Sequence, residues 1–201
     1  MSSTTLMRWS GLSVSLGGLA YALFVLVHPF SGLSDPHVIH SGQWLVAHNL
    51  HLLGAVLVLL GLPGLYVAGM RQTGRLGLVG YLVAFVGTAL HAGSGMFTAY
   101  VVPLAPALAD PSGPAQGSPF VAVFLLLTLA MIAGFTLLAL PGRVGLPLIL
   151  GAVLFNVPAV AVPYAIPLVG GVLVGAGLGG WGYALWSGAA GPVAQPRPAA
   201  L

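Results

Sequence analysis

The feature that most constrains this chain is its shortage of charge. Five arginines and two aspartates are the only charged side chains among 201 residues, whereas 58% of the residues are hydrophobic. Soluble domains carry roughly one quarter charged residues, so this chain cannot build an ordinary water-facing surface. The sequence therefore predicts an integral membrane protein, with the lipid bilayer as its first partner. The dispersed arginines do not form the clustered positive surface that binds nucleic acid.

Roughly 20 apolar residues cross a bilayer as a helix, and on this basis the chain divides into six segments. The uncharged stretch that follows Arg143 is too long for one crossing, and Pro163 supplies a break within it. The six predicted helices cover about 10–28, 44–69, 76–102, 119–140, 144–162 and 165–187. We expect an all-α polytopic membrane protein with six transmembrane helices in one bundle.

The charges sort by sign when six crossings are assumed. Asp35 and Asp110 fall on one face of the membrane, and all the arginines fall on the other. The arginines are Arg8, Arg71, Arg75, Arg143 and Arg197. Because positive residues favour the inner face, both the N-terminus and the C-terminus are predicted to be cytoplasmic.

Residues 1–187 are predicted to form a single transmembrane domain. The apolar run from Gly11 to Val27 lacks a small-residue cleavage site, so we expect a retained first span rather than a secretory signal. The segment 188–201 is rich in proline and alanine and is expected to be a disordered tail.

Glycines are frequent and fall into a pattern in the last predicted helix. Gly171, Gly175 and Gly179 recur every four residues and lie on one stripe. Such a ridge of small residues lets helix backbones approach closely. We assign it to helix packing, either with another helix of this chain or with a second copy in a homo-oligomer.

All six histidines precede residue 92 and, in this topology, lie in the outer half of the membrane or above it. His48 and His51 project from one face of the second helix, and His91 lies about one turn deeper in the third. Intramembrane ionisable residues are costly and commonly functional. We predict a cofactor site at His48, His51 and His91 that binds haem b or a metal, with open space beside Gly93 and Gly95.

A second candidate is an exposed metal site in the first outer loop. Imidazole suits zinc and copper, and this loop holds two histidines three residues apart beside an aspartate. The predicted ligands of this divalent metal are His28, His37, His40 and Asp35.

An alternative interpretation assigns the histidines no ligand at all. His28, His37 and His40 would then be solvated or interfacial. His51 and His91 would bond a backbone carbonyl or a polar side chain of Asn49, Thr88 or Ser94. The sequence leaves the two interpretations open.

Three functions are compatible with these patterns. The first is a cofactor protein in electron transfer or a subunit of a respiratory complex. The second is a non-catalytic accessory subunit that packs against a membrane-protein partner. The third is an exporter or binder of an apolar small molecule, with Asn156 contributing. Cysteine and lysine are absent, which excludes thiolate and Schiff-base chemistry. No catalytic residues are predicted, and we expect no catalytic activity of the chain on its own.

Most of the chain, from GGLAYALFVLVHPF through WLVAHNLHLLGAVLVLLGLPGLYV and GRLGLVGYLVAFVGTAL to GWGYALW, resembles a group of uncharacterised small six-span bacterial integral membrane proteins. The W-x-x-x-H of Trp44 and His48 looks like a feature of that group. The resemblance implies the same topology and a place in the bacterial inner (cytoplasmic) membrane, and it implies no activity.

Overall fold

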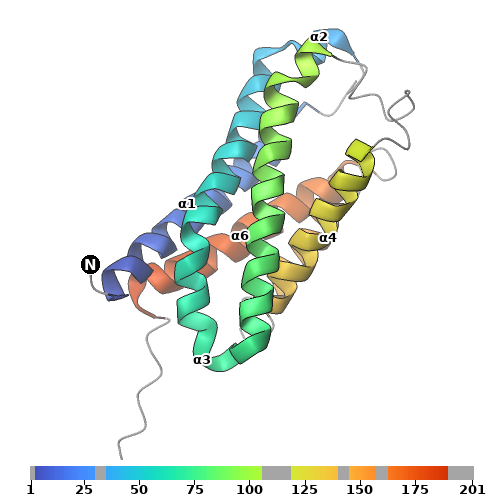
Figure 1. Ribbon diagram of the computed structural model, residues 1–201. Helices are drawn as coiled ribbons and strands as arrows, with labels where there is room; N and C mark the ends of the chain where they lie inside the picture. The colour runs from blue at the N-terminus through green and yellow to red at the C-terminus, as the bar shows by residue number, and fades with distance from the viewer. Residues whose placement is uncertain (1–2, 30–34, 106–118, 140–144, 157–162, 190–201) are drawn as a thin grey trace, which may run out of the picture.

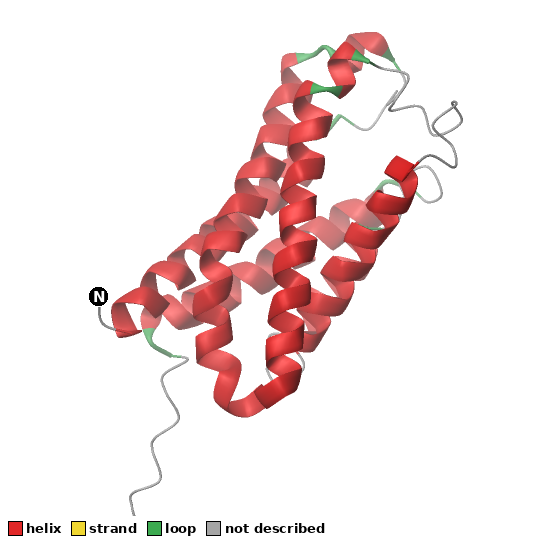
Figure 2. Cartoon of the chain, in the orientation of Figure 1, coloured by secondary structure: helices red, strands yellow, loops and turns green. Residues whose placement is uncertain are grey.

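The computed structural model describes residues 3–29, 35–105, 119–139, 145–156 and 163–189. Of these residues 92% are helical and none lies in a strand, which confirms the all-α prediction (Figure 2). The helices are α1 (Ser3–Val27), α2 (Pro36–Ile39), α3 (Gly42–Tyr100), the 3-10 helix η1 (Val102–Leu104), α4 (Pro119–Ala139), α5 (Gly145–Phe155) and α6 (Ala165–Ser187).

Helix α3 contains two of the predicted spans. It folds back on itself at Gly74, where φ is 51° and ψ is −132°, a conformation that glycine adopts readily and other residues avoid. Its first arm is Gly42–Gly69, and its second arm begins at Gly74. Figure 1 shows the two arms side by side, with the turn at one end of the molecule and α2 at the opposite end.

Within the described residues, four helical segments are long and apolar enough to cross a membrane. They are Thr4–Val27, Gly42–Gly69, Gly74–Leu104 and Ala165–Ser187. The described apolar stretches of α4 and α5 are shorter, at Leu126–Leu138 and Leu146–Phe155. Large aliphatic side chains such as Leu60 and Leu129 are exposed on the outside of the bundle. Helices of this length with apolar outer faces are typical of a membrane protein.

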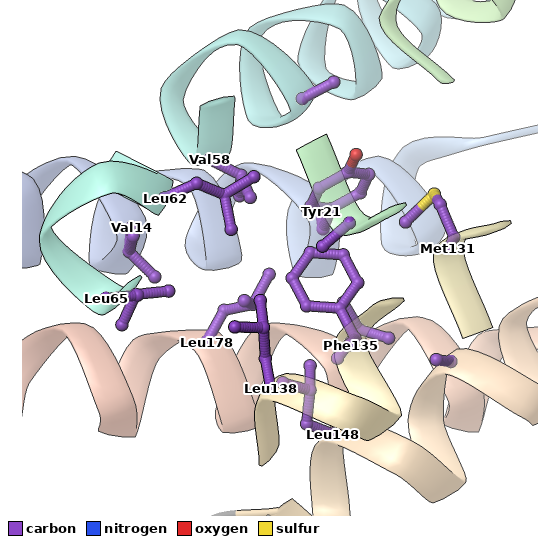
Figure 3. Packing of buried hydrophobic residues seen from close by; sticks show 14 of the residues in the cluster. Val14, Tyr21, Val58, Leu62, Leu65, Met131, Phe135, Leu138, Leu148 and Leu178 are labelled. Atoms are coloured by element: carbon purple, nitrogen blue, oxygen red, sulfur yellow. The ribbon is translucent and has the colours of Figure 1, made fainter. Parts of the chain in front are cut away.

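The helices pack in chain order, and α6 returns to α1 to close a ring (Figure 1). The first arm of α3 packs on α1, and the second arm packs on α4. Apolar side chains from every long helix fill the ring, as Figure 3 shows. They include Val14, Val58, Leu62, Leu65, Met131, Phe135, Leu138, Leu148 and Leu178.

The glycine stripe of α6 lies against α1 of the same chain. A Cβ added at Gly175 would be 2.7 Å from the Gly18 carbonyl oxygen, and one at Gly171 would strike Val25. A Cβ at Gly179 would meet nothing within 4 Å among the described residues. Gly182 continues the stripe instead, against the backbone of Gly11. Gly179 instead meets α1 through its backbone, because the Ser15 hydroxyl donates to the Gly179 carbonyl oxygen at 3.1 Å.

Both ends of α6 are hydrogen-bonded to α1. At the Gly74 end of the molecule, Arg8 Nε donates to the Trp186 carbonyl oxygen at 3.1 Å. At the α2 end, the Tyr164 hydroxyl donates to the Val25 carbonyl oxygen at 2.7 Å. Burial raises the pKa of Tyr164, so this hydroxyl stays protonated and remains a donor.

Some sequence predictions lie outside the described residues. These are the tail from residue 190 onward, positions 157–162 of the fifth predicted span, and the charged residues Asp110, Arg143 and Arg197.

The α1–α6 contact gives a first prediction. Gly175→Ala should lower the free energy of unfolding by about 1–3 kcal/mol, because the new Cβ would also lie 2.9 Å from Ala22 Cβ. Gly179→Ala is the matched control. It should leave stability unchanged or raise it by up to about 1 kcal/mol, because alanine favours the helix and meets no neighbour. Thermal unfolding in detergent, followed by circular dichroism, measures both. Equal losses in the two variants would contradict the assigned contact.

Candidate functional site

Two stripes of ring-bearing side chains face each other where α1 crosses the first arm of α3. Residues spaced i, i+3 and i+7, or i, i+4 and i+7, share one face of a helix. The facing residues are Tyr21, Phe24 and His28 from α1 and Trp44, His48 and His51 from α3. The two helices are antiparallel, so Tyr21 meets His51 at the inner end of the stripes and His28 meets Trp44 at the α2 end.

His51 and His91 contact each other across the two arms of α3. Their ring centroids are 4.2 Å apart and the rings are edge to face, with an interplanar angle of 69°. The Tyr21 ring lies 5.7 Å from His51 and 5.9 Å from His91. Three helical segments therefore converge on one point, which we call the inner site and define as Tyr21, His51 and His91. All three side chains are buried.

A glycine makes room for this convergence. A Cβ on Gly95 would lie 3.3 Å from His51 Nδ1, so the absence of a side chain there lets the imidazole lie against the second arm. The open space that the sequence predicted beside Gly95 is thus occupied by His51. Gly93 differs, since a Cβ there would meet no described atom within 4 Å.

Aromatic rings enclose the inner site. Phe24 stacks on His51 at 4.8 Å with an interplanar angle of 22°. Phe155, at the end of α5, lies 5.9 Å from His91 and 6.0 Å from Tyr21. In Figure 3 the Tyr21 hydroxyl points away from Phe135 and the apolar cluster that fills the rest of the ring.

Four polar atoms of the inner site have no hydrogen-bond partner among the described residues. These atoms are the Tyr21 hydroxyl, His51 Nε2 and both ring nitrogens of His91. The side chains that could have satisfied them bond elsewhere. Thr88 donates to the Ala84 carbonyl oxygen, and Asn49 donates to the Leu45 carbonyl oxygen. An unsatisfied buried polar group costs about 1–3 kcal/mol, so a group of them requires an explanation such as an ion or a functional role.

His48 belongs to a different group from His51 and His91. Its ring is 5.0 Å from His28 and 4.2 Å from Trp44, and its Nδ1 hydrogen-bonds the Trp44 carbonyl oxygen at 2.9 Å. Since a carbonyl oxygen can only accept, Nδ1 carries the proton and Nε2 keeps its lone pair. We call His28 and His48 the outer pair. Of the three predicted ligands, His51 and His91 thus contact each other, and the ring of His48 contacts those of His28 and Trp44.

The predicted loop metal ligands are not brought together. The His37 backbone N–H donates to the Asp35 carboxylate at 2.8 Å, which caps the short helix α2. His37 and His40 are exposed, whereas His28 turns inward and meets Phe24 at 5.2 Å. In the described part of the chain, no three His, Cys, Asp or Glu side chains are close enough to hold a metal ion together. An ion in the inner site would therefore need the Tyr21 oxygen as well as two imidazoles.

The spacing of the inner site fits a small ion better than haem. With metal–nitrogen bonds near 2.0 Å, two imidazoles on opposite sides of an iron have ring centroids about 6 Å apart. Two imidazoles in a tetrahedral arrangement need about 5 Å. The observed 4.2 Å is within about 1 Å of the second value and far from the first. The Tyr21 distances of 5.7 and 5.9 Å suit a phenol oxygen on the same ion.

Sequence reasoning missed three residues of this region: Tyr21, Phe24 and Phe155. The signal for the first two is the spacing of Tyr21, Phe24 and His28, which is the reverse of that of Trp44, His48 and His51 and therefore matches it on an antiparallel helix. No comparable pattern identifies Phe155. Asn156, suggested as a transport residue, donates to the Ala152 carbonyl oxygen one turn earlier.

Comparison with known proteins identifies no relative of this chain. The chain matches no protein-family model, no curated protein sequence and no solved structure.

The unpartnered hydroxyl of Tyr21 gives a second prediction. Tyr21→Phe should leave the stability of the metal-free protein unchanged or raise it by about 1 kcal/mol, because it removes a buried polar group that has no partner. Tyr164→Phe is the control, since it removes a hydroxyl that donates to Val25. It should lower stability by about 1 kcal/mol. Thermal unfolding in detergent with a chelator measures both. A loss in Tyr21→Phe as large as in the control would reveal a hydrogen bond at Tyr21.

Proposed function

We propose that this chain is a six-span inner-membrane protein that binds one transition-metal ion, copper in the first place, at Tyr21, His51 and His91. A bound cuprous ion would suit the protein to a role beside a respiratory complex. The proposal keeps histidines as the ligands but assigns the site to the residues that lie together in the structure. It assigns a single metal ion to this site in place of haem b.

The observation that carries this proposal is the convergence of unpartnered donors. One phenol and two imidazoles come from three helical segments, are buried, and have polar atoms that bond nothing in the described chain. A polar group inside a membrane protein must find a partner or be neutralised. A metal ion satisfies several such atoms at once. A bound ion would also give a purpose to Gly95, which leaves the room that lets His51 contact His91.

The chemistry of the donors favours copper. Imidazole suits copper and zinc, and no described carboxylate or thiolate contributes to this site. Neutral donors in an apolar region favour an ion of low charge, because the cost of burying an ion rises steeply with its charge. Cuprous ion carries a single charge and accepts two or three ligands. Zinc usually takes four ligands in structural sites.

The six-span topology and its orientation are part of the same proposal. Arg8 and Arg75 lie at the Gly74 end of the molecule and Asp35 lies at the α2 end (Figure 1). This distribution supports a cytoplasmic Gly74 end. The outer pair and the inner site would then lie in the half of the protein that faces away from the cytoplasm.

The chain lacks cysteine, so single introduced cysteines can report the topology. Gly42→Cys, at the start of α3, should react with a membrane-impermeant maleimide in intact bacterial cells. Ser187→Cys, at the end of α6, should react only after the membrane is permeabilised. Both positions are exposed in the structure. Labelling of both from one side would contradict the six-span count, and the reverse pattern would contradict the orientation.

The metal proposal is tested on protein purified in mild detergent and reconstituted with buffered cuprous ion. Wild type should bind about one ion per chain. His51→Phe and His91→Phe should each weaken binding by about 100-fold or more, since even the loss of an outer-shell partner costs 10–100-fold. His40→Ala, in the exposed loop, should bind as wild type does. Equilibrium competition with a coloured copper chelator measures the affinities, and elemental analysis measures the content.

Other outcomes overturn the proposal in different ways. A Soret band in the purified protein that disappears in His51→Phe would restore the haem assignment. Binding of zinc but not copper at the same histidines would show that zinc, not copper, is the bound metal. Copper lost in His40→Ala but retained in His51→Phe would move the site to the loop. A colourless protein that binds no metal would leave the accessory packing subunit as the remaining interpretation.

A further inference from the structure

The outer pair lies on the same two helix stripes as the inner site, nearer the α2 end. His28 follows the last residue of α1 and is half-buried. His48 is buried and lies one helical turn before His51 on α3. Trp44 holds this group in place, because its Nε1 donates to the Thr98 carbonyl oxygen at 3.0 Å and its own carbonyl oxygen hydrogen-bonds His48. The bond leaves His48 Nε2 free to bind an electrophile. Two imidazoles alone form a weak metal site, suited to temporary binding.

Phe24 contacts both groups. Its ring centroid is 5.2 Å from His28, 5.8 Å from His48 and 4.8 Å from His51. An ion that moves from His48 to His51 would travel along the face of α3 that the Phe24 ring contacts.

Phe24 is less deeply buried than its neighbour Tyr21 on α1. Its side chain is half-buried, in contrast to the fully buried Tyr21 one turn earlier on α1. Phenylalanine forms no hydrogen bond that would fix its rotamer. Partly exposed side chains change rotamer on fast timescales, so a rotation of the ring away from His51 opens contact between the two histidine groups.

We propose that the outer pair, His28 and His48, is a second metal site that takes up the ion from the α2 side, and that Phe24 is the gate between it and the inner site. This inference rests on the proposed function. The transfer is a ligand exchange, in which the bond from the ion to the outer imidazole breaks as a bond to the His51 imidazole forms. The oxidation state of the ion does not change. Neutral imidazoles release no proton, and the only proton released is that of Tyr21 if its oxygen binds as phenolate.

The first test measures the rate at which apo protein in detergent takes cuprous ion from a coloured chelator complex. Phe24→Ala should speed uptake and release by about tenfold, which corresponds to a barrier lower by about 1.4 kcal/mol. His28→Ala should slow uptake by about tenfold and leave the final content unchanged. Phe85→Ala, which removes an exposed ring on the second arm of α3, is the matched control and should behave as wild type.

The second test needs no metal. Diethyl pyrocarbonate modifies accessible imidazoles, and mass spectrometry locates the modified residues. In wild type the exposed His37 and His40 should react first, the half-buried His28 next, and His51 and His91 slowly. Phe24→Ala should raise the rates at His51 and His91 by about tenfold, whereas Phe85→Ala should not change them. Thermal unfolding of each variant establishes that it is folded.

The outcomes separate the inference from the function on which it rests. If wild type binds no copper, the proposed function fails, and so does the metal route, whatever the modification rates are. If wild type binds copper but Phe24→Ala and His28→Ala take it up at the wild-type rate, the inner site stands and the gate is wrong. If His51 in wild type is modified as fast as His28, Phe24 does not close the inner site.

Discussion

Helix α1 lies between α3 and α6, and glycines on two of its faces let both neighbours approach its backbone. Gly17 faces the first arm of α3, where an added Cβ would lie 3.0 Å from the Gly54 carbonyl oxygen. Gly18 faces α6, where an added Cβ would lie 2.7 Å from the Gly175 carbonyl oxygen. Lipid supplies no hydrophobic force between helices, so such backbone contact is a main source of packing energy in a membrane. The two contacts fix the position of α1, and with it the distance at which Tyr21 faces His51.

The fold could be predicted from the sequence to the extent that hydropathy determines it. The predicted span 165–187 coincides with α6, and 119–140 nearly coincides with α4. Hydropathy places the start of α1 near residue 10, but the helix begins at Ser3, because helical hydrogen bonds continue into a polar segment that a hydropathy window excludes. Helix α2 was missed although Asp35 followed by Pro36 is a helix start, with an aspartate cap and proline at the first helical position.

The candidate site was only partly predictable. Burial of His51 and His91 follows from their depth in apolar segments, and the structure places them together. The pairing of His48 with His28 could not be predicted, because it depends on how far α1 is shifted along α3. That shift is set by Gly17 and Gly54, whose partners on the facing helix no single-helix pattern reveals. Tyr21 and Phe24 were missed for the same reason, since aromatic residues in an apolar helix are usually lipid-facing or core residues.

The same rings that enclose the inner site also determine what it can bind. Phe24 and Phe155 keep polar groups away from Tyr21, His51 and His91, so the local dielectric constant is low and a charge there is poorly screened. A doubly charged ion held only by neutral donors is then strongly disfavoured, while a singly charged ion is tolerated. If Phe24 opens, water and the outer pair can stabilise an ion during its passage, and closure restores the apolar surroundings. Access and selectivity thus depend on one side chain, which is why Phe24, rather than either histidine group, is the residue that links them.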